Sequence, residues 1–171
     1  MRRILVALSG LMLAEFLDRA LGQLHWQDAE LHLLHVVDTR PLAEFGLAAG
    51  ALPARTGRAA EQMRAMGALG GEAGRRMLEE AEALVAARRA AGGAIRRLQR
   101  TGVPEHEIVA AAYEVGADLI VLGAAEEPAG PAPPGPGPRA RFPHRRLTPT
   151  VRFVVDHAPC DVLLLYAGPR G

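Results

Sequence analysis

Four short runs of aliphatic residues set the strongest limit on how this sequence can fold. They span residues 4–8, 31–37, 119–122 and 162–166, and none of them alternates regularly between apolar and polar residues. Such runs are typical of parallel strands that are covered by helices on both faces of a sheet. Because only 4% of the residues are aromatic, the core between sheet and helices must be built from Leu, Val, Ile and Ala.

Stretches with helical periodicity separate these runs. Their apolar residues recur on one helical face over residues 16–24, 77–85, 108–115 and 151–155. Pro104 suits the start of the third helix, and Gly116 suits its end. A weaker strand over 94–100 has Ile95 and Leu98 among three arginines, which is tolerable only at a sheet edge. The alternation of strands and helices predicts an α/β fold with a parallel sheet and right-handed crossovers.

The length of 171 residues favours one domain, spanning 1–171. Two segments interrupt the alternation and are interpreted as insertions at about 40–74 and 124–149. The first is rich in Ala and Gly, and we expect no more than a turn or two of helix in it, at 58–66. Within the second, residues 129–138 consist only of Ala, Gly and Pro, which predicts a mobile loop with polyproline character.

Charge and cysteine content exclude several classes of protein. Twenty basic residues against nineteen acidic ones leave a net charge of +1, so no overall field favours a nucleic acid or a membrane as partner. Every basic residue is arginine, which excludes lysine-dependent chemistry such as a P-loop or a Schiff base. The single cysteine, Cys160, cannot form an internal disulfide, and no apolar run approaches the length of a bilayer span. We therefore expect a cytoplasmic protein.

Four segments carry a resemblance to a known family. They are ILVA at 4–7, LLHVVD at 33–38, GADLIVLG at 116–123 and HAPCDVLL at 157–164. Together, and in this order, they resemble the universal stress protein family over nearly the whole chain. The resemblance implies an open five-stranded parallel sheet of order 3-2-1-4-5 with helices on both faces, as in adenine nucleotide α-hydrolase-like proteins. It also implies a stress-response protein, a homodimer in most members, with one branch that binds ATP.

The ATP-binding branch has an acidic residue after strand one and a loop of pattern G-x2-G-x9-G-[S/T] after strand four. In this chain the acidic position is Ser9, and Gly123 matches the first loop glycine. The second glycine falls on Glu126, and the closing Gly-Ser falls on Thr148 and Pro149, in a loop about a dozen residues longer than the pattern. Of the features of the ATP-binding branch, this chain retains Gly123 and the main chain around Val36, which would lie beside the base of the nucleotide. These departures predict weak or absent ATP binding.

An alternative retains a nucleotide or phosphate ligand. The acid-free stretch before the last helix includes Arg145 and Arg146, whose guanidinium groups suit phosphate. Thr148 or Thr150 would add a hydroxyl at the start of that helix. Two functions therefore stay open: a binding module that regulates or protects partner proteins through its surface, and a stress protein that responds to ATP or another adenine nucleotide through the strand-four loop.

The remaining residues that could bind a metal or take part in catalysis are better explained by structural roles. His32 and His35 lie three apart on a strand, so they point to opposite faces and cannot share a metal ion. His157 suits the capping of a helix end, and Cys160 is interpreted as an inert core thiol. A fragment of a pyrophosphatase loop at Ser9 lacks the glycine, acid and serine that such a loop needs. We find no convergent catalytic groups, so we expect no enzyme.

The last strand predicts how the protein assembles. In the order 3-2-1-4-5 it lies at a sheet edge, and a bare apolar edge would promote aggregation. Pairing with its two-fold mate covers that edge. We therefore predict a homodimer through Val162, Leu163, Leu164, Leu165 and Tyr166.

Overall fold

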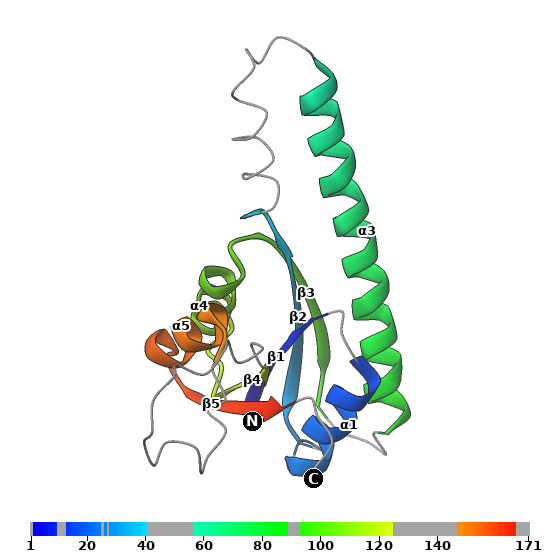
Figure 1. The fold of residues 1–171 in the computed structure, drawn as a ribbon. Helices are drawn as coiled ribbons and strands as arrows, with labels where there is room; N and C mark the ends of the chain where they lie inside the picture. The colour runs from blue at the N-terminus through cyan, green and yellow to red at the C-terminus, as the bar shows by residue number, and fades with distance from the viewer. Residues whose placement is uncertain are drawn as a thin grey trace, which may run out of the picture.

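The computed structural model describes residues 2–9, 13–24, 26, 28–40, 57–88, 93–124 and 147–166, without the side chains of 57–64 and 66. Arg145, Arg146, Glu126 and the 129–138 segment lie outside these residues, so the predictions made for them stay predictions. Strands and helices alternate along the chain, as the sequence predicts (Figure 1). The elements are β1 (Arg3–Leu8), α1 (Leu13–Gln23), β2 (Glu30–Asp38), α3 (Gly57–Ala87), β3 (Ile95–Gly102), α4 (Pro104–Val115), β4 (Leu119–Ala124), α5 (Pro149–His157) and β5 (Asp161–Tyr166).

All five strands are parallel, and their order is β3-β2-β1-β4-β5, which confirms the fold class. The arginine-rich strand β3 is at one edge, and the apolar strand β5 is at the other. The chain reverses its direction of progress across the sheet between β1 and β4, where Ala7 pairs with Leu122. In open α/β sheets, ligands bind beyond the carboxyl ends of the strands at this switch point.

Two aliphatic clusters fill the space between the sheet and its helices. Ile4, Val6 and Leu8 point to the side that α1 and α3 cover, whereas Leu5 points to the side of α4 and α5. Leu5 and Ile120 are fully buried on the second side. Strands whose odd and even residues are both buried need no polar alternation, which explains the continuous aliphatic runs of the sequence.

Helix α3 is much longer than the sequence analysis expects. It begins at Gly57 and runs for 31 residues, so half of the insertion placed at 40–74 is helix. Figure 1 shows its first half extending past the end of the sheet. Ala, Arg, Met and Glu in residues 58–66 are good helix formers, and the glycines that follow were misread as signs of a loop.

Those glycines let the helix lie close to the sheet. A Cβ atom added to Gly74 would be 2.3 Å from His35 Cδ2, and one added to Gly70 would be 3.2 Å from Val37 Cγ1. Gln99 Nε2 of β3 donates a hydrogen bond of 2.8 Å to the carbonyl of Gly71. The glycines are therefore contact positions of a packed helix, because any side chain at Gly74 would push α3 off strand β2.

Candidate functional site

Ser9 and Gly123 mark the carboxyl edge at the switch point. Ser9 directly follows β1 and is exposed, and Gly123 lies near the end of β4. A Cβ atom on Gly123 would be 3.6 Å from the ring of Phe16 in α1, which is ordinary van der Waals contact. Because β1 and β4 are paired in parallel, the two residues lie at the same edge of the sheet. At this edge the chain has the uncharged hydroxyl of Ser9, at the position where the ATP-binding branch has an acidic residue.

Val36 lies on the neighbouring strand β2. Its side chain is half-buried and packs against the cluster under α4 and α5. Leu8 at the end of β1 pairs with His35, so Val36 is one residue beyond the end of β1. The side chain of Val36 belongs to the core, which leaves its main chain as the part that could edge a ligand.

The start of α5 is held by its own residues. Thr148 is the N-cap, and its Oγ1 accepts a hydrogen bond of 3.4 Å from the Val151 N–H. Pro149 is the first helical residue and has no N–H. Thr150 Oγ1 donates a hydrogen bond of 3.0 Å to Glu105 Oε2 at the start of α4. Both hydroxyls that the sequence offers to a phosphate are therefore used inside the protein.

The capping role leads to a stability prediction. Replacing Thr148 by alanine removes the acceptor of the Val151 N–H, and we expect a loss of about 0.5–1 kcal/mol in the free energy of unfolding, because the capping bond is long. Thr148→Ser keeps an acceptor at the same position and should leave the stability unchanged. Urea denaturation of both variants measures the difference. Equal stabilities for the two variants would contradict the capping role.

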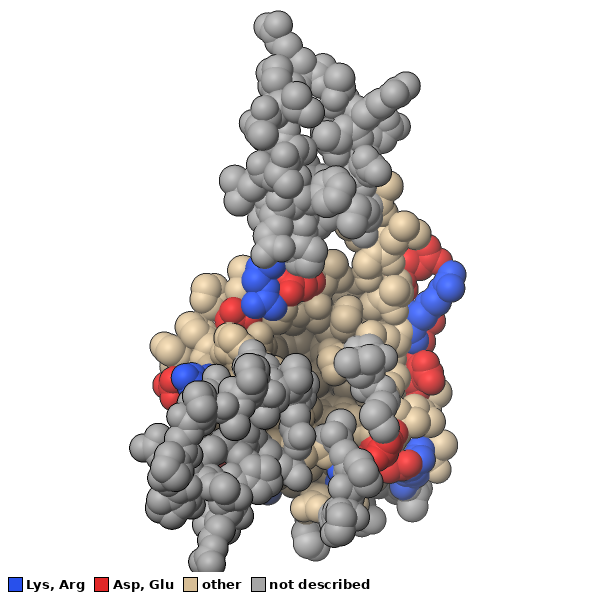
Figure 2. All heavy atoms as spheres, viewed as in Figure 1, with Lys and Arg blue, Asp and Glu red and all other residues tan. Residues whose placement is uncertain are grey.

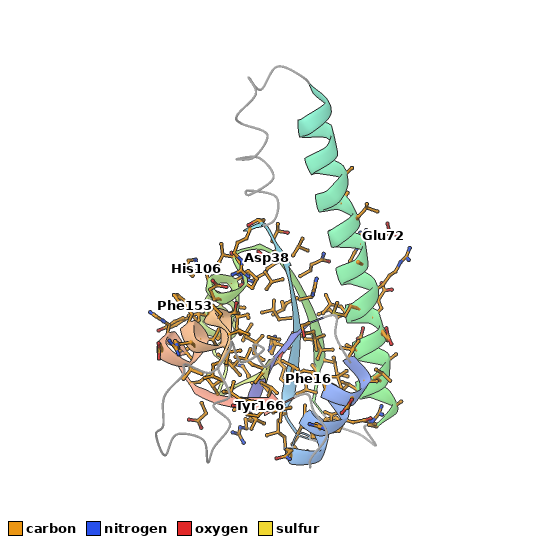
Figure 3. All side chains as sticks on the ribbon, viewed as in Figure 1. Phe16, Asp38, Glu72, His106, Phe153 and Tyr166 are labelled. Atoms are coloured by element: carbon orange, nitrogen blue, oxygen red, sulfur yellow. The ribbon has the colours of Figure 1, made fainter. Side chains whose placement is uncertain are left out.

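A charged network ties the end of β2 to the starts of α4 and α5. Arg40 Nη2 is 2.7 Å from Asp38 Oδ2, and Arg40 Nη1 is 3.3 Å from Glu105 Oε1. The hydrogen bonds from Arg40 hold the pKa of Asp38 below its usual value. In Figure 3, Asp38 lies at the end of β2, close to the first turn of α4, which carries His106. The network links β2, α4 and α5 beside the switch point.

This network is not predicted above, although the sequence contains a signal for it. Arg40 follows β2 by two residues, and Glu105 is in the first turn after β3. Carboxyl ends of adjacent parallel strands meet at one edge, so residues that follow β2 and β3 could have been paired. Asp118 lies at the opposite end of the sheet from Asp38, since it precedes β4 and accepts a hydrogen bond of 2.7 Å from the Arg3 N–H.

Among the described residues, two further kinds of site come into question, a metal site at the histidines and a reactive thiol at Cys160. His35 packs against α3, and His32 lies on the opposite face beside Glu30, so the two imidazoles do not meet. No group of three or more His, Cys, Asp or Glu side chains in the described part of the chain could hold a metal ion. Burial raises the pKa of the Cys160 thiol, which makes its reactive thiolate scarcer.

The charges on the described surface are mixed. Figure 2 shows basic and acidic atoms next to each other rather than in a large patch of one sign. The described structure also contains ion pairs between oppositely charged side chains, such as Arg97 with Glu82 at 3.1 Å. Among the described residues, no helix is both long and apolar enough to cross a membrane.

The fold and this edge define a class of protein. The strand order β3-β2-β1-β4-β5, with described helices on both faces of the sheet, is that of the adenine nucleotide α-hydrolase-like folds. Residues 1–165 match the Universal stress protein family, and the chain belongs to that family. No curated protein sequence matches the chain.

Solved structures show the same fold. The universal stress protein UspA from Lactobacillus plantarum is 27% identical, with coverage of 96% of this chain and 97% of that one and a TM-score of 0.59. A family protein from Arabidopsis thaliana with AMP bound is 16% identical, with coverage of 98% and 93% and a TM-score of 0.55. A universal stress protein in complex with cAMP is 19% identical, with coverage of 98% of both chains and a TM-score of 0.53.

Proposed function

We propose that this universal stress protein family member is a dimeric regulatory binding module, not an enzyme, and that it does not hold ATP through the loop after β4. The main observation behind this proposal is the start of α5. There Thr148 caps the helix, Pro149 lacks an N–H and Thr150 is hydrogen-bonded to Glu105. A phosphate site at a helix start depends on free amides and hydroxyls. Here Pro149 lacks an N–H, and the Val151 N–H and both threonine hydroxyls are already engaged.

The charge beside this helix start also disfavours a triphosphate. Glu105 Oε2 lies 3.0 Å from Thr150 Oγ1, so a phosphate that reached this hydroxyl would face a carboxylate. Arg40 contacts the same carboxylate at 3.3 Å and offsets part of its charge. However, Asp38 holds Arg40 at 2.7 Å, so that guanidinium is not free for phosphate. At the β1 end, Ser9 offers no carboxylate to a ligand.

Isothermal titration tests this proposal directly. We expect no saturable heat from ATP or ADP at up to millimolar concentration, because the helix start cannot take their phosphates. Micromolar binding of ATP would overturn the proposal. Glu105→Gln provides an informative variant, since it removes the negative charge but keeps an acceptor for Thr150. If phosphate access is blocked by that charge, this variant alone should gain weak binding.

A second function, binding of an adenine monophosphate, is favoured by the bound AMP and cAMP of two structural neighbours. In that case the same titration with AMP or cAMP would give micromolar affinity. Binding that is lost in an Arg145→Ala/Arg146→Ala double variant would assign the contact to those arginines. Arg75→Ala/Arg76→Ala is the matched control, because it removes the same charge from exposed positions on α3, across the sheet from α5.

The dimer is proposed to form through β5. This strand is at the sheet edge beside β4, and its apolar residues Val162, Leu163 and Leu164 are only half-buried in one copy of the chain. A second copy would complete the hydrogen bonding of the edge and cover these side chains. The position of β5 at the sheet edge supports the proposal.

A further inference from the structure

The amino end of the sheet contains a buried charged cluster that the proposed function does not use. Glu30 and His32 are the two buried polar or charged side chains among the residues that the structure describes, with exposed fractions of 9% and 5%. Both lie on β2 and point to the same face, because they are two residues apart on a strand. Buried ionisable groups need partners, so the partners of each decide what the cluster does.

Glu30 has partners on both neighbouring strands. Its Oε1 accepts a hydrogen bond from Arg96 Nε on β3, and its Oε2 lies 3.9 Å from Arg3 Nε on β1. The hydrogen bond from Arg96 lowers the pKa of Glu30 below its ordinary value of 4.5. One ionised carboxylate therefore holds together three strands, and Arg96 is the contact that binds edge strand β3 to it.

His32 has no such partner. Neither Nδ1 nor Nε2 makes a hydrogen bond within the described structure, and the Nε2 to Glu30 Oε1 distance of 3.6 Å is too long for one. The strand register sets His32 directly beside Arg96. The imidazole is thus a neutral, buried group next to a carboxylate that two arginines already share.

We propose that His32 is an acid-sensitive switch for the β2–β3 edge: a proton on its imidazole adds a buried cation beside Arg96 and loosens strand β3. The protonated ring would compete with Arg96 for Glu30 Oε1, which it approaches at 3.6 Å. Strand β3 is the strand that yields, because β2 is its single neighbour in the sheet. Strand β2 stays in place through its pairing with β1.

Charges of both signs surround the His32 imidazole. Arg3 and Arg96 are the charged side chains that face the cluster from β1 and β3, and both repel a cation. Helix α4, which packs over this face, carries Tyr113, which is exposed, and Glu114, whose carboxylate binds Arg100. Asp118 is engaged with the Arg3 N–H. Glu30 remains the one described carboxylate that attracts the proton, and it is already shared.

The sign of the pH effect follows from burial. Burial lowers the pKa of His32 from the ordinary 6.5, so the unfolded chain binds this proton more tightly than the folded one. The stability that depends on a neutral His32 is fully present above the ordinary pKa. It is lost as the pH falls from that value to the lowered pKa of the folded protein. Within that window the unfolding constant rises about tenfold per pH unit. Glu30 does not titrate there, since its pKa is lowered from 4.5.

Thermal unfolding between pH 7.5 and 5.5 tests the switch. We expect the wild type to lose several degrees of Tm more than His32→Leu, which fills the buried site without a titrating group. His106→Leu is the matched control, because His106 is exposed on α4 and its loss should leave the pH dependence intact. Parallel profiles for the wild type and His32→Leu would overturn the proposal.

A second measurement needs no substitution. NMR titration of the wild-type imidazoles should show His32 changing protonation state below its ordinary pKa of 6.5. Amide exchange at Arg97 and Leu98 of β3 should speed up at least severalfold over the same pH range, while exchange at Val121 of the interior strand β4 stays slow. A His32 imidazole that titrates at or above 6.5, or unchanged exchange in β3, would show that the cluster is no switch.

Discussion

Replacing Gly74 by valine is expected to destabilise the protein by about 3 kcal/mol, the upper range for overpacking a core. The added Cβ would be 2.3 Å from His35 Cδ2 and 2.9 Å from His35 Nε2, distances that real Cβ atoms do not show. The imidazole has little room to move, because its Nδ1 is buried. Helix α3 would have to shift away from strand β2, and its buried residues Leu78 and Val85 would lose contact with the core.

Gly67→Val is the matched control. It is the same substitution in the same helix, but nothing lies within 4 Å of the added Cβ. We expect its free energy of unfolding to stay within about 0.5 kcal/mol of the wild type. For a chain of this size, the loss at Gly74 corresponds to a fall in Tm of about 6–12 °C.

A double variant identifies the contact responsible. If the clash with the imidazole causes the loss, His35→Ala should restore part of the stability of Gly74→Val, with a coupling of at least about 1 kcal/mol. Additive losses, or equal stability of Gly74→Val and Gly67→Val, would refute the close approach of α3 to β2.

The proposed dimer predicts an equally clear change in mass. Replacing Val162 and Leu164 of β5 together by lysine should convert a dimer into a monomer at micromolar concentration. Two-fold symmetry places each new charge at the interface twice, and inward-pointing lysines are a natural block to edge pairing. Size-exclusion chromatography with light scattering measures the mass, and circular dichroism checks that the fold is retained.

Leu69→Lys is the control for added charge, because Leu69 is 67% exposed on α3. It should remain dimeric. The proposal fails if the wild type is already a monomer, or if the lysine variant of β5 keeps the dimeric mass. A dimer that dissociates with Leu69→Lys instead would move the interface to the projecting half of α3.

The periodic elements could be predicted because their signals are local. The run at 119–122 becomes β4, and Pro104 and Gly116 bound helix α4, with Gly116 at a φ of 60° as its left-handed cap. Each of these depends on the covalent preferences of a few adjacent residues. The strand order came from the resemblance to a family and not from periodicity, because a pattern of buried faces does not say which strand lies beside which.

The sequence by itself thus predicted an aliphatic parallel α/β fold with an edge strand rich in arginine, and the structure has both. The tertiary structure decided the rest: that the glycines of α3 face His35, that Arg40 joins Asp38 to Glu105, and that His32 is buried without a hydrogen bond. The physical reason is distance along the chain. A helix or turn forms from neighbouring residues, whereas each of these contacts depends on how whole elements are placed against one another, by register and packing, and no single segment encodes that placement.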